Sequence, residues 1–220
     1  MTNGTGQNSV VHGASGNAAR ASGISSVVFY SGNALGTGAV SIGQNTLSVG
    51  HGCFSQGWEC YSGCSTPAGD AYLKNGDASK LPTGANRYCA SFGIMNAAVQ
   101  DAAFATGRQT TARGLNAFSG GYGTYADHND SVALGSGTIT GRTQQVVIGK
   151  ANAIDNDAYF VIGNGTPTSN FDEAGKMIAT DRRNAFVVKT NGNVEMGTSL
   201  KIGNTLITEE QLTKLLGLIK

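Results

Sequence analysis

Glycine recurs along this chain at a fixed interval. From Gly36 to Gly57 the spacing is seven residues, and from Gly93 to Gly163 every interval is 7 or 14 residues. A short phrase returns with the glycines, with apolar residues three and one positions before several of them, as in AVSIG and VVIG. A fixed period marks a stack of similar units, each of which contacts its neighbours. The spacing therefore predicts a repeat architecture.

The residues before each glycine alternate between apolar and small, which is the pattern of a β-strand with two different faces. Val40 and Ile42 lie on the apolar face, and Ser41 lies on the opposite face. Strands of about four residues bury too little surface to stand alone, so they must stack. Glycine supplies the turns with positive φ. We therefore predict an all-β, parallel β-solenoid with 14-residue coils built from two seven-residue half-repeats.

Charge and motifs exclude several classes of function. The net charge is +1, and the longest basic run is Arg182-Arg183, so we expect no nucleic-acid partner. No stretch approaches the ~20 apolar residues of a membrane span, so we expect no membrane insertion. The aspartates are scattered through predicted turns, and there is no nucleophile elbow or phosphate loop. The sequence therefore predicts neither an enzyme nor a cofactor.

The repeat phrases resemble a known family. AVSIG (39–43), TLSVG (46–50) and NDSVALG (129–135) are similar to the head repeat of YadA-like trimeric autotransporter adhesins, and the likeness covers about 9–57 and 90–165. The resemblance implies a left-handed parallel β-roll, three copies around one axis, and a role in attachment. Within such a homotrimer we expect the rolls to pack through their faces of small residues.

The same repeat occurs in bacteriophage tail-fibre and minor structural proteins, whose ends the segments 184–194 and 207–216 resemble. We therefore expect a structural attachment protein on the surface of a phage virion, as a tail or head fibre. Its expected partners are other virion proteins and a host cell-surface glycan or protein. The alternative is the head of a bacterial surface adhesin, and a lesser alternative is a polysaccharide-degrading tail spike.

Three regions follow from these patterns. Residues 1–165 are the roll, 166–206 are a β-rich connector, and 207–220 are a helix. Asn191-Gly192 between apolar runs predicts a hairpin. Thr208 and Gln211 have the spacing of a helix capping box. The helical stripe that would form the trimer contact consists of Leu212, Leu215, Leu216 and Ile219.

The seven-residue register fails at about 58–90, because Gly57 and Gly93 are 36 residues apart. This segment reads as a loop inserted into the roll. Loops on a rigid scaffold often carry recognition, and aromatic side chains supply contact area. The candidate receptor contacts are Trp58, Tyr61, Tyr72 and Tyr88. The other interpretation is that the loop folds back to cover the roll.

Four cysteines lie in or beside the inserted loop, namely Cys53, Cys60, Cys64 and Cys89. Two disulfides would suit an extracellular particle. Free buried thiols are an equal alternative. A zinc site that includes His51 is a further hypothesis, but the cysteine spacing differs from that of common zinc knuckles. No metal site is firmly predicted.

Overall fold

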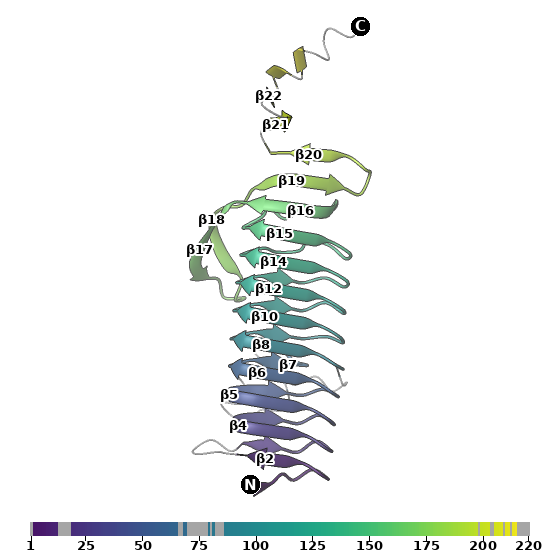
Figure 1. Cartoon of the computed structure of the whole chain (residues 1–220), viewed down its shortest axis with the longest axis vertical. Coiled ribbons are helices and arrows are strands. Elements are labelled where there is room, and N and C mark those ends of the chain that lie inside the picture. Colours follow the sequence, from purple (N-terminus) through teal and green to yellow (C-terminus); the bar gives the residue numbers. More distant parts are fainter. Residues whose placement is uncertain are drawn as a thin grey trace.

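The chain forms a tall stack of β-coils (Figure 1). The computed structural model describes residues 2–12, 19–65, 68–69, 79, 81, 86–197, 199–202, 205–208, 210–211 and 213–214. Within these residues, 18 strands belong to one continuous sheet, and two further strand pairs stand apart from it. The predicted parallel β-solenoid is thereby confirmed.

Each coil places a longer strand on one side of the roll and a shorter strand on the other. The longer strands are β2 (Val10–His12), β4 (Val27–Ala34), β5 (Val40–Ser48), β6 (Phe54–Trp58), β8 (Ala90–Ile94), β10 (Phe104–Arg108), β12 (Phe118–Tyr122), β14 (Val132–Ser136), β15 (Val146–Lys150) and β16 (Ala158–Asn164). The two-residue strands are β3 (Arg20–Ala21), β7 (Tyr61–Ser62), β9 (Ala97–Ala98), β11 (Thr111–Ala112) and β13 (Tyr125–Ala126). Strands β4 and β5 run around the corner and contribute to both sides.

The coils are stacked in register. Phe104 pairs with Phe118, and Phe118 pairs with Val132, so residues 14 apart in sequence are neighbours in the long-strand sheet. The short strands follow the same rule, since Thr111 pairs with Tyr125. The predicted coil length is therefore confirmed from β8 to β16, whereas Val27 of β4 pairs with Val40 of β5, an offset of 13 residues. The two halves of the coil are unequal, because one carries a five-residue strand and the other a two-residue strand.

Small side chains fill the interior. The second residue of each five-residue strand of the roll is fully buried, as at Ser55 and Ala105, and it faces small residues of the short strands, such as Ala98 and Ala112. The two sheets approach closely, and the inward position of the long strands holds no residue larger than valine, as at Val147 and Val161. The prediction that three rolls pack through their small residues is therefore wrong. These residues already face one another inside a single chain.

The repeated glycine is required at one corner of the coil. Gly107 has φ +116, and a Cβ built on it would lie 2.1 Å from the carbonyl oxygen of Gly121 in the next coil. Gly57 has φ +129, and its Cβ would lie 1.9 Å from the carbonyl oxygen of Gly93. Any side chain here would collide with backbone and also adopt an unfavourable conformation. The stacking distance of the coils thus explains the glycine period.

Antiparallel strands end the stack at both extremities. At the start, β1 (Thr2–Asn3) pairs antiparallel with β2. At the other end, β19 (Asn184–Lys189) pairs antiparallel with β16, and β20 (Val194–Met196) pairs antiparallel with β19. Asn191 and Gly192 lie in the connection between β19 and β20, where Gly192 N–H donates to Lys189 O at 3.1 Å. Such strands cover the last parallel coil, whose free edge would otherwise recruit further chains.

Beyond this cap, β21 (Ser199–Ile202) and β22 (Thr205–Thr208) form an antiparallel pair. The two hydrogen bonds of the predicted capping box follow. Thr208 N–H donates to Gln211 Oε1 at 3.0 Å, and Gln211 N–H donates to Thr208 Oγ1 at 3.3 Å. The predicted trimer-helix residues Leu212, Leu215, Leu216 and Ile219 lie outside the described residues. In the part of the chain that the structure describes, no helix is long and apolar enough to span a membrane.

Candidate functional site

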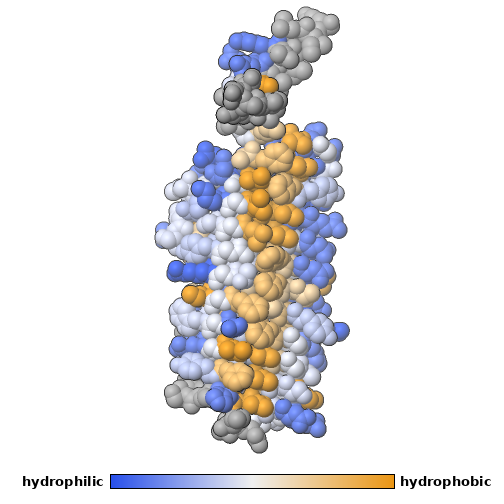
Figure 2. Space-filling view, in the orientation of Figure 1, coloured by the Kyte–Doolittle hydropathy of each residue, from blue (hydrophilic) through white to orange (hydrophobic). Residues whose placement is uncertain are grey.

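An apolar stripe runs the length of the long-strand side (Figure 2). It consists of the apolar residues on either side of the buried inward residue of each long strand, which point outward and remain partly exposed. Phe104, for example, is 37% exposed. The apolar stripe comprises Val27, Phe29, Val40, Ile42, Phe54, Phe92, Phe104, Phe118, Val132, Leu134, Val146, Ile148, Phe160 and Ile162.

Aromatic rings stack along the middle of the apolar stripe. The ring centroids of Phe54 and Phe92 are 5.1 Å apart, those of Phe92 and Phe104 are 5.5 Å apart, and those of Phe104 and Phe118 are 5.3 Å apart. Soluble monomers rarely expose contiguous apolar patches above a few hundred Å². A continuous stripe over all coils therefore has the character of a contact surface.

The short-strand side is covered by the chain itself. Over the lower coils, Cys64, Ala68 and Leu81 of the inserted segment pack on Leu47 and Tyr61, which are buried. Regular pairing continues through Ser62 and resumes at Ala90, so the insertion starts later than predicted. The described part of the segment thus lies against the roll, in agreement with the second interpretation of the loop.

Over the upper coils, the cover is a hairpin of β17 (Thr166–Phe171) and β18 (Met177–Asp181). Tyr125 Oη donates a hydrogen bond of 2.6 Å to Gly175 O in the hairpin turn. Burial raises the pKa of Tyr125, so this donor keeps its proton at neutral pH. Lys176 Nζ lies 2.6 Å from Asp127 Oδ2, and Arg182 donates to Gly137 O at 2.9 Å. Several polar contacts therefore fasten the hairpin to the roll.

The repeat makes room for this hairpin. The corner position held by Met95 and Gln109 in lower coils is Gly123 and Gly137 in the next two. A Cβ built at Gly123 would lie 2.5 Å from Met177 Cε, and one at Gly137 would lie 2.8 Å from Met177 Sδ. The buried Met177 side chain thus packs against two corners of the roll that carry no side chain, Gly123 and Gly137. This change of residue type within the repeat is the sequence signal for the cover.

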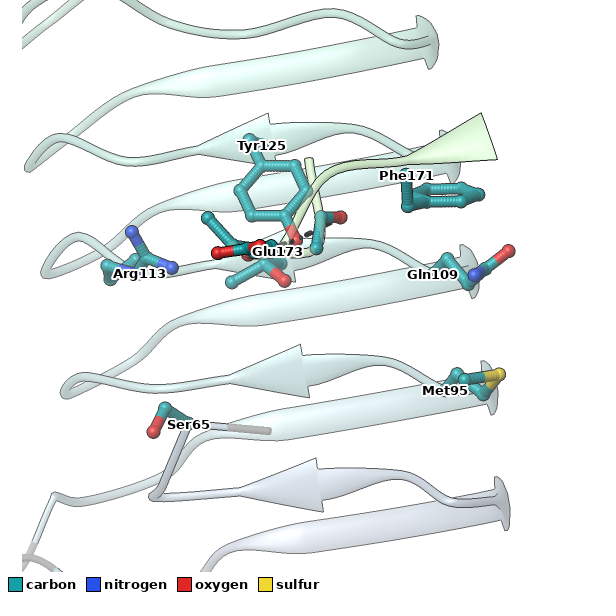
Figure 3. A pocket seen from close by; sticks show the side chains of 10 residues that line it. Ser65, Met95, Gln109, Arg113, Tyr125, Phe171 and Glu173 are labelled. Atoms are coloured by element: carbon teal, nitrogen blue, oxygen red, sulfur yellow. Dashed lines mark hydrogen bonds between the residues drawn. The ribbon is translucent and has the colours of Figure 1, made fainter. Parts of the chain in front are cut away.

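A cavity of about 490 Å³, here named the side cavity, lies between the two covers. It spans several coils of the short-strand side. The described residues that line it are Ser65, Met95, Gln109, Thr111, Arg113, Tyr125, Phe171, Glu173, Ala174 and Gly175. Figure 3 shows Arg113 and Ser65 along one edge of the cavity and Phe171, Gln109 and Met95 along the other, with Tyr125 and Glu173 between them.

The side cavity combines opposite charges with planar polar groups. Arg113 lies 3.3 Å from Asp127 Oδ1, and its guanidinium is 5.9 Å from the centre of the Tyr125 ring. The Phe171 ring is held edge-on to Tyr122, with centroids 5.8 Å apart. Within the described part of the chain, no hydrogen bond engages the side chain of Gln109 or Glu173. These two groups are available to a ligand.

The aromatic residues predicted as receptor contacts do not form one site. Trp58 is 43% exposed at the end of β6, whereas Tyr88 is 71% exposed and precedes the start of β8. Because β6 and β8 are paired neighbours, the two residues lie at opposite ends of these strands. Tyr61 is 1% exposed and belongs to the core. Tyr72 lies outside the described residues.

The cysteines take positions that small residues hold elsewhere in the repeat. Cys53 and Cys89 occupy the same inward position in neighbouring coils, where Ala103 stands in the next coil. All four cysteines, Cys53, Cys60, Cys64 and Cys89, are buried, and none of them forms a disulfide. Burial raises the pKa of the Cys60 thiol, which keeps it protonated at neutral pH.

His51 is exposed, whereas the thiols are buried. Among the residues that the structure describes, no three His, Cys, Asp or Glu side chains are grouped to hold a metal ion. Comparison of the chain with protein-family models and with curated proteins finds no match.

Proposed function

We propose that this protein is a structural attachment protein that works as a homotrimeric rod on the surface of a phage virion. The apolar stripe is the observation that carries the proposal, because it follows the whole roll and is left open by the covering segments. The other side is already occupied by the inserted segment and the hairpin. The apolar stripe is thus the one extended apolar surface of a single roll that other copies of the chain could bury.

The direction of the apolar stripe favours side-by-side assembly. It runs parallel to the long axis of the stack, as Figures 1 and 2 show in the same orientation. Three parallel copies around a common axis would bury all three stripes and close the symmetry, without growth into filaments. Packed sheets about 10 Å apart would interlock the outward Phe and Val side chains. The result would be a stiff rod with the covering segments outside.

The resemblance to phage tail-fibre and minor structural proteins supports the proposed place on a virion. The partners would then be other virion proteins and a host-surface glycan or protein. The alternative, the head of a bacterial surface adhesin, has the same rod and differs in where the protein is found. Antibodies against the chain should label purified virions under the first proposal and the surface of intact bacteria under the second.

Assembly is tested by the mass of the purified protein in light scattering and by chemical cross-linking. We expect three copies per particle at micromolar concentration. Phe104→Glu should release monomers, because it puts a charge into the proposed interface. Leu115→Glu is the matched control: Leu115 is also 37% exposed, but it lies at a corner, outside the apolar stripe. A wild-type monomer, or a Phe104→Glu variant that remains trimeric, would contradict the proposal.

A further inference from the structure

We propose that the side cavity binds a single pyranose unit of a surface glycan. This inference rests on the proposed attachment function and gives it a ligand class and a location. The carrying observation is the meeting of Arg113, Glu173, Gln109 and an aromatic ring, Phe171, around one cavity of about 490 Å³.

The size and construction of the side cavity suit a small ligand. Ligand pockets usually measure ~300–1,000 Å³, and they are largely formed before the ligand arrives. One wall belongs to the roll, at Thr111 and Arg113, and the other belongs to the hairpin turn around Glu173. The turn is held by the bond from Tyr125 Oη to Gly175 O and by the ion pair between Lys176 and Asp127. The walls are thus fixed relative to each other.

The chemistry of the lining favours a sugar. A pyranose presents hydroxyl groups in its plane and C–H groups on its faces. Glu173 accepts hydrogen bonds, Arg113 donates them, and Gln109 does both. Phe171 offers an aromatic ring to a C–H face, and its orientation is supported by Tyr122. All of these groups line the same cavity, with Arg113 along one edge, Gln109 and Phe171 along the other and Glu173 between them (Figure 3).

Other ligand classes fit less well. A phosphate or carboxylate would meet the Glu173 carboxylate as well as the Arg113 guanidinium, so the two charges give no net preference for an anion. An extended peptide would need an open strand edge for backbone pairing. The strands under the cavity, β11 and β13, pair with each other instead. A neutral, hydroxyl-rich ligand uses both charges without leaving either one unpaired.

The place of the cavity matches the proposed rod. Thr111 and Tyr125 point outward on the short-strand side, while the apolar stripe lies on the long-strand side. Three copies assembled through the stripe would therefore carry three outward-facing cavities at one level. Weak binding to a repetitive glycan would then be raised by avidity, by ~10²–10⁴ over a single site.

The test uses the full chain and free sugars: glucose, galactose, mannose, N-acetylglucosamine and N-acetylgalactosamine. Saturation-transfer NMR detects weak binding, and titration gives the dissociation constant. For a ligand of this size we expect about 1–10 mM for at least one sugar. Glu173→Ala and Gln109→Ala should each weaken binding of that sugar at least ~10-fold, because each removes a hydrogen-bonding group from the cavity.

Gln144→Ala is the matched control. Gln144 has the same residue type and nearly the same backbone φ as Gln109, +57 against +55, but it lies at the opposite corner of the coil. The strain of the substitution is thus equal in both variants. Glu173 is exposed in a turn, so its replacement leaves the fold intact, which the unfolding midpoint verifies.

Two results would overturn the inference: no transfer from any of the sugars, or binding that Glu173→Ala and Gln109→Ala leave unchanged. The proposed function is tested separately by the trimer mass and by attachment of the wild-type rod to host cells. If the rod attaches, and attachment survives Glu173→Ala but is lost when the cells are treated with protease, the receptor is a protein bound elsewhere. The cavity proposal would then fail while the attachment proposal stands.

Discussion

Two parts of the interior have the same backbone but different chemistry. In the lower coils the inward residues Ser48, Ser55 and Ser62 form a zigzag across the two sheets, with Oγ–Oγ distances of 3.0 and 2.8 Å. In the coils above, the matching short-strand positions are alanines, such as Ala98, whereas on the long strands Ala105 stands between the serines Ser91 and Ser119. Both sets are fully buried. The narrow interior thus selects for volume and accepts either polarity.

A buried hydroxyl is accepted because the backbone supplies its partner. Ser55 Oγ lies 2.9 Å from Leu47 O, and Ser62 Oγ lies 2.6 Å from Phe54 O, in each case eight residues back along the chain. An unpaired buried hydroxyl would cost roughly 1–3 kcal/mol in proteins. In the coils above, Ser91 and Ser119 donate instead to a carbonyl five residues ahead, Asn96 O and Thr124 O. Serine and alanine are therefore near equivalents here.

Substitution of the corner glycine should have the largest effect on stability, and this effect should be the same in both regions. Gly57→Ala in the serine-lined part and Gly107→Ala in the alanine-lined part should each lower the free energy of unfolding by about 3–5 kcal/mol, because both add a clash and an unfavourable φ. Urea unfolding at one protein concentration measures both. A difference above ~1.5 kcal/mol between them would mean that the two regions do not share one backbone geometry.

Overpacking should have the next largest effect. Ala105→Leu places a large side chain between two sheets that are spaced for alanine, and we expect a loss of about 3 kcal/mol. Leu115→Ala, a change at a residue that is 37% exposed, is the control and should cost less than ~1 kcal/mol. Thermal and urea unfolding of both variants provide the measurement. A stable Ala105→Leu would show that the interior can widen.

Removal of a serine hydroxyl should cost less. Ser55→Ala deletes the centre of the zigzag, and we expect about 1–2 kcal/mol because Ser48 and Ser62 keep their carbonyl partners. The double variant Ser48→Ala/Ser55→Ala should lose less than the sum of the two single variants, since they share a hydrogen bond. Strict additivity in the double-mutant cycle would mean that the contact between the hydroxyls contributes nothing.

The reverse change, from an inward alanine to serine, should alter the free energy of unfolding very little. In Ala112→Ser the new hydroxyl would face Phe104 O, the counterpart of the bond from Ser62 to Phe54 O, because these residues occupy equivalent register positions. We expect a change within about 0.5 kcal/mol in urea unfolding. A loss above ~2 kcal/mol would show that polarity, and not only volume, separates the two regions.

The coil length, the parallel stacking and the strand positions were predictable from the sequence. Each coil needs a glycine at the same corner, so the glycines recur in the sequence with the period of the coil. The sequence did not predict which face of each strand points inward. Alternation such as Val40–Ser41–Ile42 shows that the two faces differ, and the usual rule places the apolar face inside. Here the inward strand positions hold nothing larger than valine, and most hold Ser or Ala, so the face of small residues is buried and the apolar face is outside.

The side cavity was beyond sequence reasoning for a related reason. Its walls come from Arg113 on the roll and Glu173 on a hairpin about four coils later in the chain, and the repeat pattern does not reveal where the hairpin folds. The clue was the replacement of Met95 and Gln109 by Gly123 and Gly137 at one corner. The glycine spacing reveals the break in register between Gly57 and Gly93, but sequence proximity alone does not show whether the aromatic residues near it form one site. The fold separates Trp58 from Tyr88.

Strands β6 and β8 pair residue for residue, from Phe54 with Ala90 to Trp58 with Ile94, although an inserted segment separates them in the chain. The ladder therefore closes over the insertion without a change of register. Lineages could lengthen, shorten or exchange the segment between Ser62 and Ala90 while the diameter and rise of the roll stay constant. The inserted segment and its scaffold are thus free to evolve at different rates, and this corner is where a foreign peptide could be grafted.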